Sequence, residues 1–189
     1  MDAKERESLI RLLKGRTALW MYGSGVVGDD SVQADNMTAL TGFAFEEKSS
    51  GPAAAEWNVE VFPSMDPGPG PDTDLSELSP RWSPDPGRGN PVLARFPDQS
   101  VAAAAKRYKG YNSVYFGSLR CPAPVLHRIA RDAGVTLLAP PGYPVVADRR
   151  FTSVTAPKTG CVGIRTLNSS RVVELDMQKG ETCIIQSAP

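Results

Sequence analysis

The stretch "TALWMYGSGVVGDDSVQADNMTALTG", residues 17–42, predicts a strand, a loop and a helix in succession. Its first six residues, 17–22, are mostly apolar and do not alternate, which is typical of a strand buried on both faces of a parallel sheet. Ser31 can cap a helix that runs on to Gly42, and glycine is a common residue at helix ends. A buried strand followed by a helix indicates an α/β fold.

The loop of this stretch carries the glycine spacing of a dinucleotide-binding motif, G-x-G-x-x-G, at Gly23, Gly25 and Gly28. That motif needs a helix that begins inside it, so that the helix N-terminus faces the pyrophosphate. Here the helical pattern begins only at Ser31, and Asp29 and Asp30 would repel phosphate groups. Glu46 and Glu47 lie about 20 residues further on, where a ribose-binding acid is expected. We nevertheless predict a plain connecting loop and no cofactor.

Helices and strands continue on both sides of this stretch. A charged and leucine-rich segment predicts a helix over residues 2–14, and "FAFEE" predicts a strand over 43–47. Residues 63–91 are rich in Pro, Gly, Asp and Ser, which predicts a long irregular loop. Strands are expected at 91–96 and in a β-hairpin formed by "VAAAAKRY", "KGYN" and "SVYF", residues 101–116.

The last third of the chain changes character. An apolar stripe predicts a helix over residues 122–134, followed by the strand "VTLLA" at 135–139. Short strands separated by "PKTG", "LNSS" and "QKGE" then predict a β-rich tail. We therefore expect a three-layer α/β domain over 1–140 and a β-rich appendage over 141–189.

Composition excludes several classes of protein. The 189 residues include 21 Lys and Arg and 21 Asp and Glu, so no net charge attracts nucleic acid or an anionic membrane. The basic and aromatic run "KRYKGY" (106–111) is better explained as a hairpin turn. No segment has the length of a membrane span or the apolar core of a signal peptide, so a soluble, cytoplasmic chain is expected. The odd count of three cysteines, with no C-x-x-C, predicts neither a disulfide framework nor a zinc site.

Catalytic pairs are also hard to find. Cys121 precedes a predicted helix, where a thiolate is favoured, but the sole histidine, His127, lies six residues further along that helix. Five acids lie in the Pro/Gly-rich loop, which lacks the rigidity of a glycosidase carboxylate pair or the ligand spacing of a calcium loop: Asp66, Asp72, Asp74, Glu77 and Asp85. We predict no catalytic residue and no metal site.

Two blocks of sequence resemble a known family. They are "GRTALWMYGSGVVGDDS" with "NMTALTGF", and "SVYFGSLRCPAPVLHRIARDAGVTLLAP" with "ADRRFTSVTAPKTG" and "RVVELDMQKGE" downstream. The chain resembles the glutamine-amidotransferase-like domains of bacterial glycoside hydrolases, akin to the trimerisation domain of family 42 β-galactosidases, which follow a catalytic barrel. The resemblance covers most of the chain except the Pro/Gly-rich loop. It implies a flavodoxin-like sheet, and a non-catalytic accessory module that associates with a catalytic barrel or with further copies of itself.

The sequence departs from that family at two points. Such domains often carry a histidine where Thr155 stands, and the chain begins where the second half of the flavodoxin-like domain is expected. The resemblance therefore implies a truncated domain without hydrolase activity of its own.

A binding surface can be predicted from the strand ends. Ligands of open parallel sheets bind beyond the carboxyl ends of the strands. The segments "MYGSG", "YFGSL" and "LAPPG" are such ends, and if their strands are parallel neighbours they bring together Tyr22, Ser24, Phe116, Ser118 and Pro140. These residues are candidates for contact with a sugar or a neighbouring domain. The alternative function is a small-molecule-binding or enzymatic α/β domain that uses the same loops.

Overall fold

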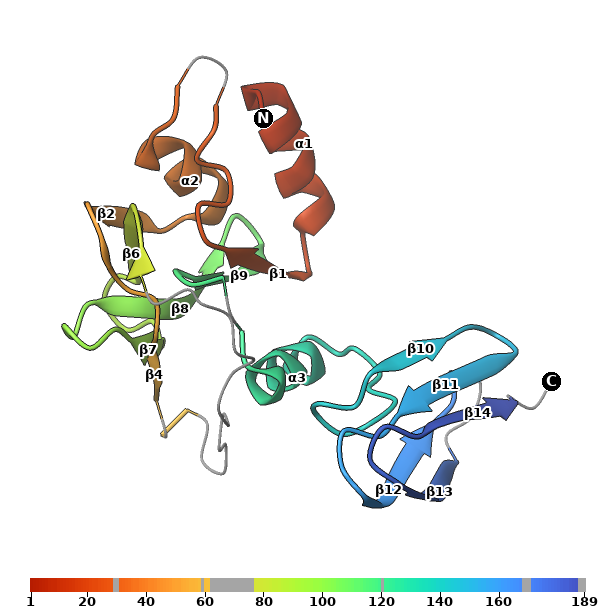
Figure 1. The fold of residues 1–189 in the computed structure, drawn as a ribbon. Helices are drawn as coiled ribbons and strands as arrows, with labels where there is room; N and C mark the ends of the chain where they lie inside the picture. Colours follow the sequence, from red (N-terminus) through yellow and green to blue (C-terminus); the bar gives the residue numbers. More distant parts are fainter. Residues whose placement is uncertain (29–30, 59, 62–76, 120, 168–170, 187–189) are drawn as a thin grey trace. The chain divides into compact units, whose positions relative to one another are not determined.

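A computed structural model describes residues 1–189 except 29–30, 59, 62–76, 120, 168–170 and 187–189. The chain forms two compact units, Met1–Cys121 and Pro122–Pro189. Both contain helix and strand, which confirms the mixed α/β class (Figure 1). No helix within the described residues is long and apolar enough to cross a membrane.

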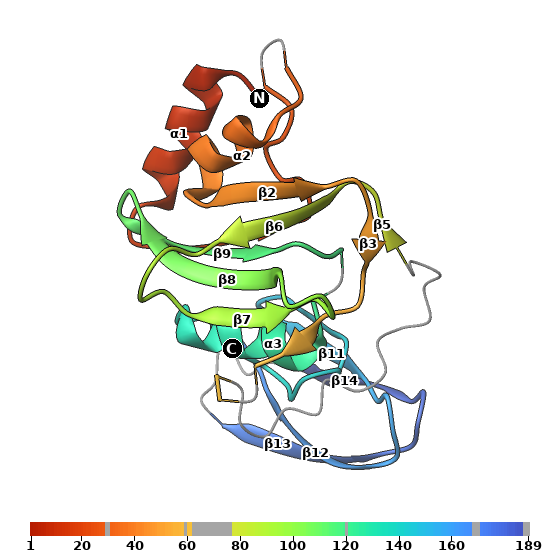
Figure 2. The ribbon, with the colours of Figure 1, turned by 90° about the vertical axis from the view of Figure 1, so that its left-hand side faces the viewer.

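The first unit is built around a five-stranded sheet (Figure 2). Its strands, in spatial order, are β1 (Thr17–Met21), β9 (Tyr111–Phe116), β8 (Val101–Tyr108), β7 (Val92–Arg95) and β4 (Glu56–Trp57). The predicted parallel strand is confirmed, because β1 pairs in parallel with β9. The remaining pairs of this sheet are antiparallel. The expected three-layer, flavodoxin-like arrangement is therefore not confirmed.

The predicted hairpin over 101–116 is confirmed. Strands β8 and β9 pair antiparallel up to Tyr108 and Tyr111, which leaves a two-residue turn. Both turn residues have positive φ, 43° at Lys109 and 90° at Gly110, as a tight turn between twisted strands requires.

Helices α1 (Ala3–Leu13) and α2 (Ala34–Thr41) lie at the same end of the first unit in both ribbon views (Figures 1 and 2). Helix α1 confirms the predicted N-terminal helix. It begins in a capping box, in which the Glu5 amide donates to Asp2 Oδ1 at 2.7 Å and the Asp2 amide donates to Glu5 Oε2 at 2.9 Å. Ile10 packs with Ala18 of β1 and Tyr111 of β9, which attaches the helix to the sheet.

Helix α2 confirms a predicted helix but corrects its beginning. The helix starts at Ala34, and Ser31 is not its cap. The Ser31 carbonyl accepts the amide of Gly28 at 2.8 Å and the side chain of Asn36 at 3.2 Å. These bonds hold the Ser31 backbone away from the helix, so its hydroxyl caps nothing. The predicted end is confirmed, since Gly42 adopts the left-handed conformation.

The prediction of an irregular loop over 63–91 is wrong for its second half. Strand β6 (Arg81–Asp85) pairs antiparallel with β2 (Ala44–Lys48), which itself confirms the strand predicted at 43–47. Strand β5 (Glu77–Leu78) pairs with β3 (Gly51–Pro52). Trp82 of β6 is buried in a cluster with Met37, Phe43, Ala104 and Tyr115. Burial of this indole outweighs the turn-forming composition around it.

The second unit consists of helix α3 (Ala123–Asp132) and two small sheets. One sheet has the order β10 (Val145–Ala147), β11 (Phe151–Thr155), β14 (Thr182–Gln186), and the other pairs β12 (Gly160–Arg165) with β13 (Val172–Met177). Residues from four strands and the segment after β11 close over a small core: Val154, Ala156, Val162, Ile164 and Met177, with Cys183 packed against it. The predicted helix and β-rich tail are confirmed.

The strand predicted at 135–139 does not form. Residues 135–139 have no strand conformation. The Arg165 amide of β12 donates a hydrogen bond to the Leu138 carbonyl at 2.7 Å, which connects this segment to the sheet. Gly134, with φ of 79°, turns the chain sharply before this segment and Pro140 and Pro141 follow it, so few ladder bonds are available. Along the chain, the boundary between the two compact units falls between Cys121 and Pro122, whereas the sequence-based division was drawn after residue 140.

Candidate functional site

The carboxyl ends of β1 and β9 lie side by side, as the strand-end hypothesis requires. Met21 is paired with Phe116, and the Tyr22 amide donates to the Phe116 carbonyl at 2.9 Å. The loops that carry Tyr22 and Ser24 on one strand and Ser118 on the other therefore begin at one edge of the sheet. Pro140 belongs to the second unit, and the strand that it was expected to follow is absent.

Most of these strand-end side chains are engaged inside the first unit. The Tyr22 hydroxyl donates to the Pro80 carbonyl at 2.6 Å, and desolvation by burial raises the pKa of this phenol. The Ser24 hydroxyl donates to the Met21 carbonyl of its own turn. Phe116 is buried, with its ring centre 5.4 Å from that of Trp57, and Ser118 is buried as well. This edge is therefore a packed junction, and the aromatic face of Phe116 is not open to a ligand.

The glycine loop does not have the geometry of a dinucleotide site. Val27 and Val32, on either side of the motif's last glycine, form an isolated antiparallel β-bridge, and α2 begins only at Ala34. The helix N-terminus thus lies beyond the motif, as its sequence pattern predicts. Asp29 and Asp30, on which the electrostatic argument rests, lie outside the described residues.

The other sequence candidates are dispersed. The ring atom Nε2 of His127 lies 2.9 Å from the Ala139 carbonyl, a contact that ties α3 to the segment after it. Of the five loop acids, Asp66, Asp72 and Asp74 lie outside the described residues, Glu77 is exposed on β5, and Asp85 accepts the amide of Gly87. Among the residues that the structure describes, no three His, Cys, Asp or Glu side chains are grouped to hold a metal ion.

A charged cluster lies in the first unit. Arg81 is 1% exposed, donates through Nη2 to Asp98 and Ser100, and lies 4.5 Å above the ring centre of Phe96. Asp98 also pairs with Lys48 at 2.9 Å. The Ser100 and Lys48 hydrogen bonds hold the pKa of Asp98 well below its usual value. The cluster ties β6 to the turn after β7, so we interpret it as structural.

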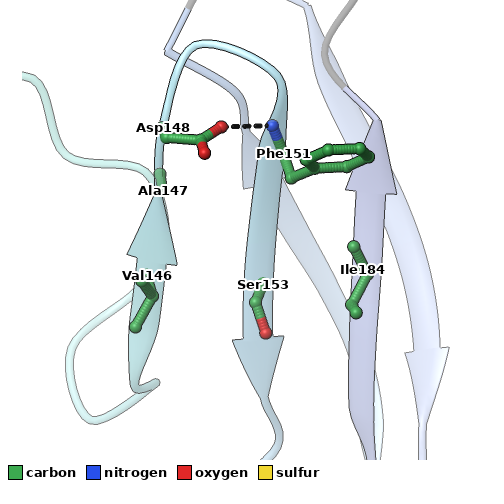
Figure 3. Close-up of a pocket in the computed structure, with 6 residues that line it drawn as sticks. All are labelled: Val146, Ala147, Asp148, Phe151, Ser153 and Ile184. Carbon is green, nitrogen blue, oxygen red and sulfur yellow. Dashed lines mark hydrogen bonds between the residues drawn. The ribbon is translucent and has the colours of Figure 1, made fainter.

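The second unit presents a different kind of surface on the sheet β10-β11-β14, shown in Figure 3. A hollow of about 380 Å³ is lined by six residues, and we call it the sheet-face hollow: Val146, Ala147, Asp148, Phe151, Ser153 and Ile184. Register places Val146, Ser153 and Ile184 in one row across the three strands. The apolar side chains are exposed, at 77% for Val146, 46% for Phe151 and 68% for Ile184.

A polar group is fixed at the end of this hollow. Asp148 Oδ1 accepts the amides of Arg150 at 2.6 Å and Phe151 at 2.7 Å, which organises the turn between β10 and β11. These two bonds, that from Arg150 first, lower the pKa of Asp148, so it is a carboxylate at neutral pH. Sequence reasoning missed the hollow. Its available signal was the adjacent apolar pairs "VV" at 145–146 and "II" at 184–185, which make a strand apolar on both faces.

Together the fold and these surfaces define a two-unit chain with a mixed sheet in one unit and small antiparallel sheets in the other. No family model and no curated protein matches the sequence. Solved structures with a similar fold are GH42 β-galactosidases. Gan42B from G. stearothermophilus has a TM-score of 0.59 at 11% identity, covering 100% of this chain and 30% of that one.

Two further β-galactosidases give the same result. The enzyme from Rahnella sp. R3 has a TM-score of 0.56 at 12% identity over 99% of this chain and 31% of its own. The enzyme from Bacillus circulans sp. alkalophilus has a TM-score of 0.51 at 12% identity over 100% and 31%. This chain therefore has the fold of a part of these enzymes, and it spans less than a third of their length.

Proposed function

We propose that this chain is a non-catalytic accessory and association module of a glycoside hydrolase. The observation that carries the proposal is the extent of the structural likeness, which includes the whole of this chain but only 30–31% of each β-galactosidase. A chain that corresponds to one part of a large enzyme is expected to serve the other parts. Its partners are a catalytic barrel or further copies of itself.

The chemistry of the described residues supports a non-catalytic role. The strand-end hydroxyls of Tyr22 and Ser24 are used in internal hydrogen bonds. The described acids Glu77 and Asp85 lie on strands of two different sheets. In the finer assignment, residues 1–140 are a partial, amidotransferase-like domain of the trimerisation type, and residues 141–189 are its β-rich appendage. The parallel pair β1–β9 next to α2 is what supports a flavodoxin-like origin.

A surface for association is available beside α2. Val27 and Val32 form an isolated antiparallel β-bridge, and their side chains are 55% and 73% exposed. Two adjacent exposed valines at one loop are more than the scattered surface apolar residue that needs no explanation. We assign the contact with a second copy or a barrel to these two valines.

The test combines assembly with activity. Sedimentation of the purified chain, alone and mixed with a GH42 catalytic barrel, is expected to show a complex, which Val32→Asp weakens. Val135→Asp is the matched control, because Val135 is 55% exposed in the other unit. A chain that stays monomeric and unbound at about 100 μM contradicts the association role.

Activity assays test the non-catalytic part and the alternative together. The chain alone is expected to turn over neither glutamine nor an aryl galactoside. Turnover that Cys121→Ala or Asp85→Asn abolishes would instead support the alternative, an enzymatic α/β domain.

A further inference from the structure

We propose that the sheet-face hollow of the second unit is a carbohydrate-binding site. It takes the apolar face of a pyranose ring against Phe151 and Ile184 and the ring's hydroxyls against Asp148 and Ser153. Figure 3 shows the ring of Phe151 extending from β11 toward β14, on the side where Ile184 lies.

The apolar part of the hollow is exposed in a way that calls for a ligand. Val146, Phe151 and Ile184 are 77%, 46% and 68% exposed, although they lie on three hydrogen-bonded strands. Their strand neighbours Val145, Cys183 and Ile185 point the opposite way and pack on the core of the unit. The sheet thus has two apolar faces, of which one is covered within the unit and the other is open.

The size of the open face favours a small ligand over a protein. The face has two strands of five residues and one of three. At a strand spacing of about 4.8 Å and a rise of about 3.3 Å per residue, its area is roughly 200 Å². A specific protein interface needs roughly 800 Å² per partner. A second copy seated on this face would therefore bury too little surface for a stable dimer, while one or two sugar rings would cover it.

The polar groups of the hollow match the edge of a sugar. Both backbone bonds to Asp148 reach Oδ1, which leaves the lone pairs of Oδ2 open to a ligand hydroxyl. The Ser153 hydroxyl lies in the row between Val146 and Ile184 and has no hydrogen-bond partner within the described residues. Small-molecule sites combine mostly apolar walls with a few placed polar groups, and a pyranose has C–H groups on its face and hydroxyls around its rim.

The site is argued from the second unit alone and does not depend on the proposed function. Only the choice of lactose as the first probe rests on it. If the chain binds sugar but associates with neither a barrel nor a second copy, this inference stands and the proposed function fails. If the chain associates but binds no sugar, the proposed function stands and this inference fails.

The experiment is a titration of the full isotope-labelled chain with lactose and with glucose, followed by backbone amide NMR. Sorbitol, an open-chain polyol, is the control ligand. Both cyclic sugars are expected to shift the amide resonances of residues 146–153 and 182–186, with dissociation constants on the order of 1 mM. Sorbitol is expected to cause no such shifts. Phe151→Ala is expected to weaken binding about tenfold, because it removes the largest apolar contact. Asp148→Asn keeps the acceptor of the turn and is expected to weaken binding less.

Leu126→Ala is the matched control variant. Leu126 belongs to the same unit and is 46% exposed, as Phe151 is, but does not line the hollow. Unchanged spectra elsewhere in the unit show that each variant is folded. No shift with either sugar at about 50 mM, or equal binding by wild type and Phe151→Ala, would overturn the proposal. Shifts of the same amides on raising the protein concentration alone would overturn it in favour of a second copy.

Discussion

The packing of Tyr108 on Gly42 allows a sharp test of the first unit. Gly42 ends α2 with φ of 83°, and a Cβ added there would lie 2.5 Å from Cδ2 and 2.9 Å from Cδ1 of Tyr108. The Tyr108 ring cannot move aside freely. Its hydroxyl donates to the Ala39 carbonyl at 3.4 Å, and its ring centre lies 5.9 Å from that of Tyr111 in a T-shaped arrangement. Gly42→Ala should therefore loosen α2 from the hairpin β8–β9.

The expected magnitude can be separated into two parts. An alanine held in the left-handed region costs roughly 1–2 kcal/mol. Forcing a side chain into a filled site adds roughly 1–3 kcal/mol, so the free energy of unfolding should fall by about 2–5 kcal/mol in total. Gly15 isolates the first part, because its φ is 74° and nothing lies within 4 Å of an added Cβ. Gly15→Ala should cost only about 1–2 kcal/mol.

Urea unfolding followed by tryptophan fluorescence measures both variants. All three tryptophans, Trp20, Trp57 and Trp82, belong to the first unit, so the signal reports that unit alone. Repeating the measurement in a Tyr108→Ala background should reduce the cost of Gly42→Ala to that of Gly15→Ala, since the clash is gone. Equal costs of the two glycine substitutions in the wild-type background, or an excess cost at Gly42 that survives Tyr108→Ala, would refute the reasoning.

The same fluorescence assay checks predictions for three further residues. Burial raises the pKa of Tyr111 to about 12 from 10.0. The neutral phenol therefore stabilises the fold fully below pH 10, and this contribution is lost as the pH rises toward 12. In Tyr111→Phe, the free energy of unfolding should fall less steeply over that pH range. Asp98→Asn should lower the free energy of unfolding by roughly 1–3 kcal/mol, because it removes the charge that pairs with the buried Arg81. Solvent limits this cost, because the Asp98 side chain is 40% exposed. With its lowered pKa, Asp98 stabilises the fold above pH 3.8, and this contribution should fade as the pH falls below that value. Tyr22→Phe should cost about 1 kcal/mol through loss of the hydrogen bond to Pro80, and no measurable change would show that this bond contributes nothing.

The sequence by itself determined those elements whose evidence is local. The apolar stripe of residues 122–134 predicted a helix, and the turn-forming "KGYN" between two β-prone runs predicted a hairpin. Short apolar runs separated by turn residues predicted the β-rich tail. The parallel strand predicted at 17–22 is confirmed by its pairing with β9, but that pairing was only a condition of the strand-end hypothesis, and only Ala18 of β1 is buried. The ends of β1 and β9 lie side by side, as the strand-end hypothesis requires, but Pro140 lies in the second unit. Local pattern could not reveal that the ring of Phe116 is buried against Trp57.

Only the tertiary structure decided the remainder, because each of those features depends on partners distant in the chain. Strand β6 forms in a Pro- and Gly-rich segment because β2, some 40 residues earlier, supplies its ladder and the core takes Trp82. The segment 135–139 has a strand-like composition and stays irregular, because among the described strands only the Arg165 amide of β12 bonds to it. The sheet-face hollow joins Val146 to Ile184 through the register of β11. A propensity describes how a residue fits a local conformation, whereas the free energy of pairing and burial depends on which distant surface the fold brings against it.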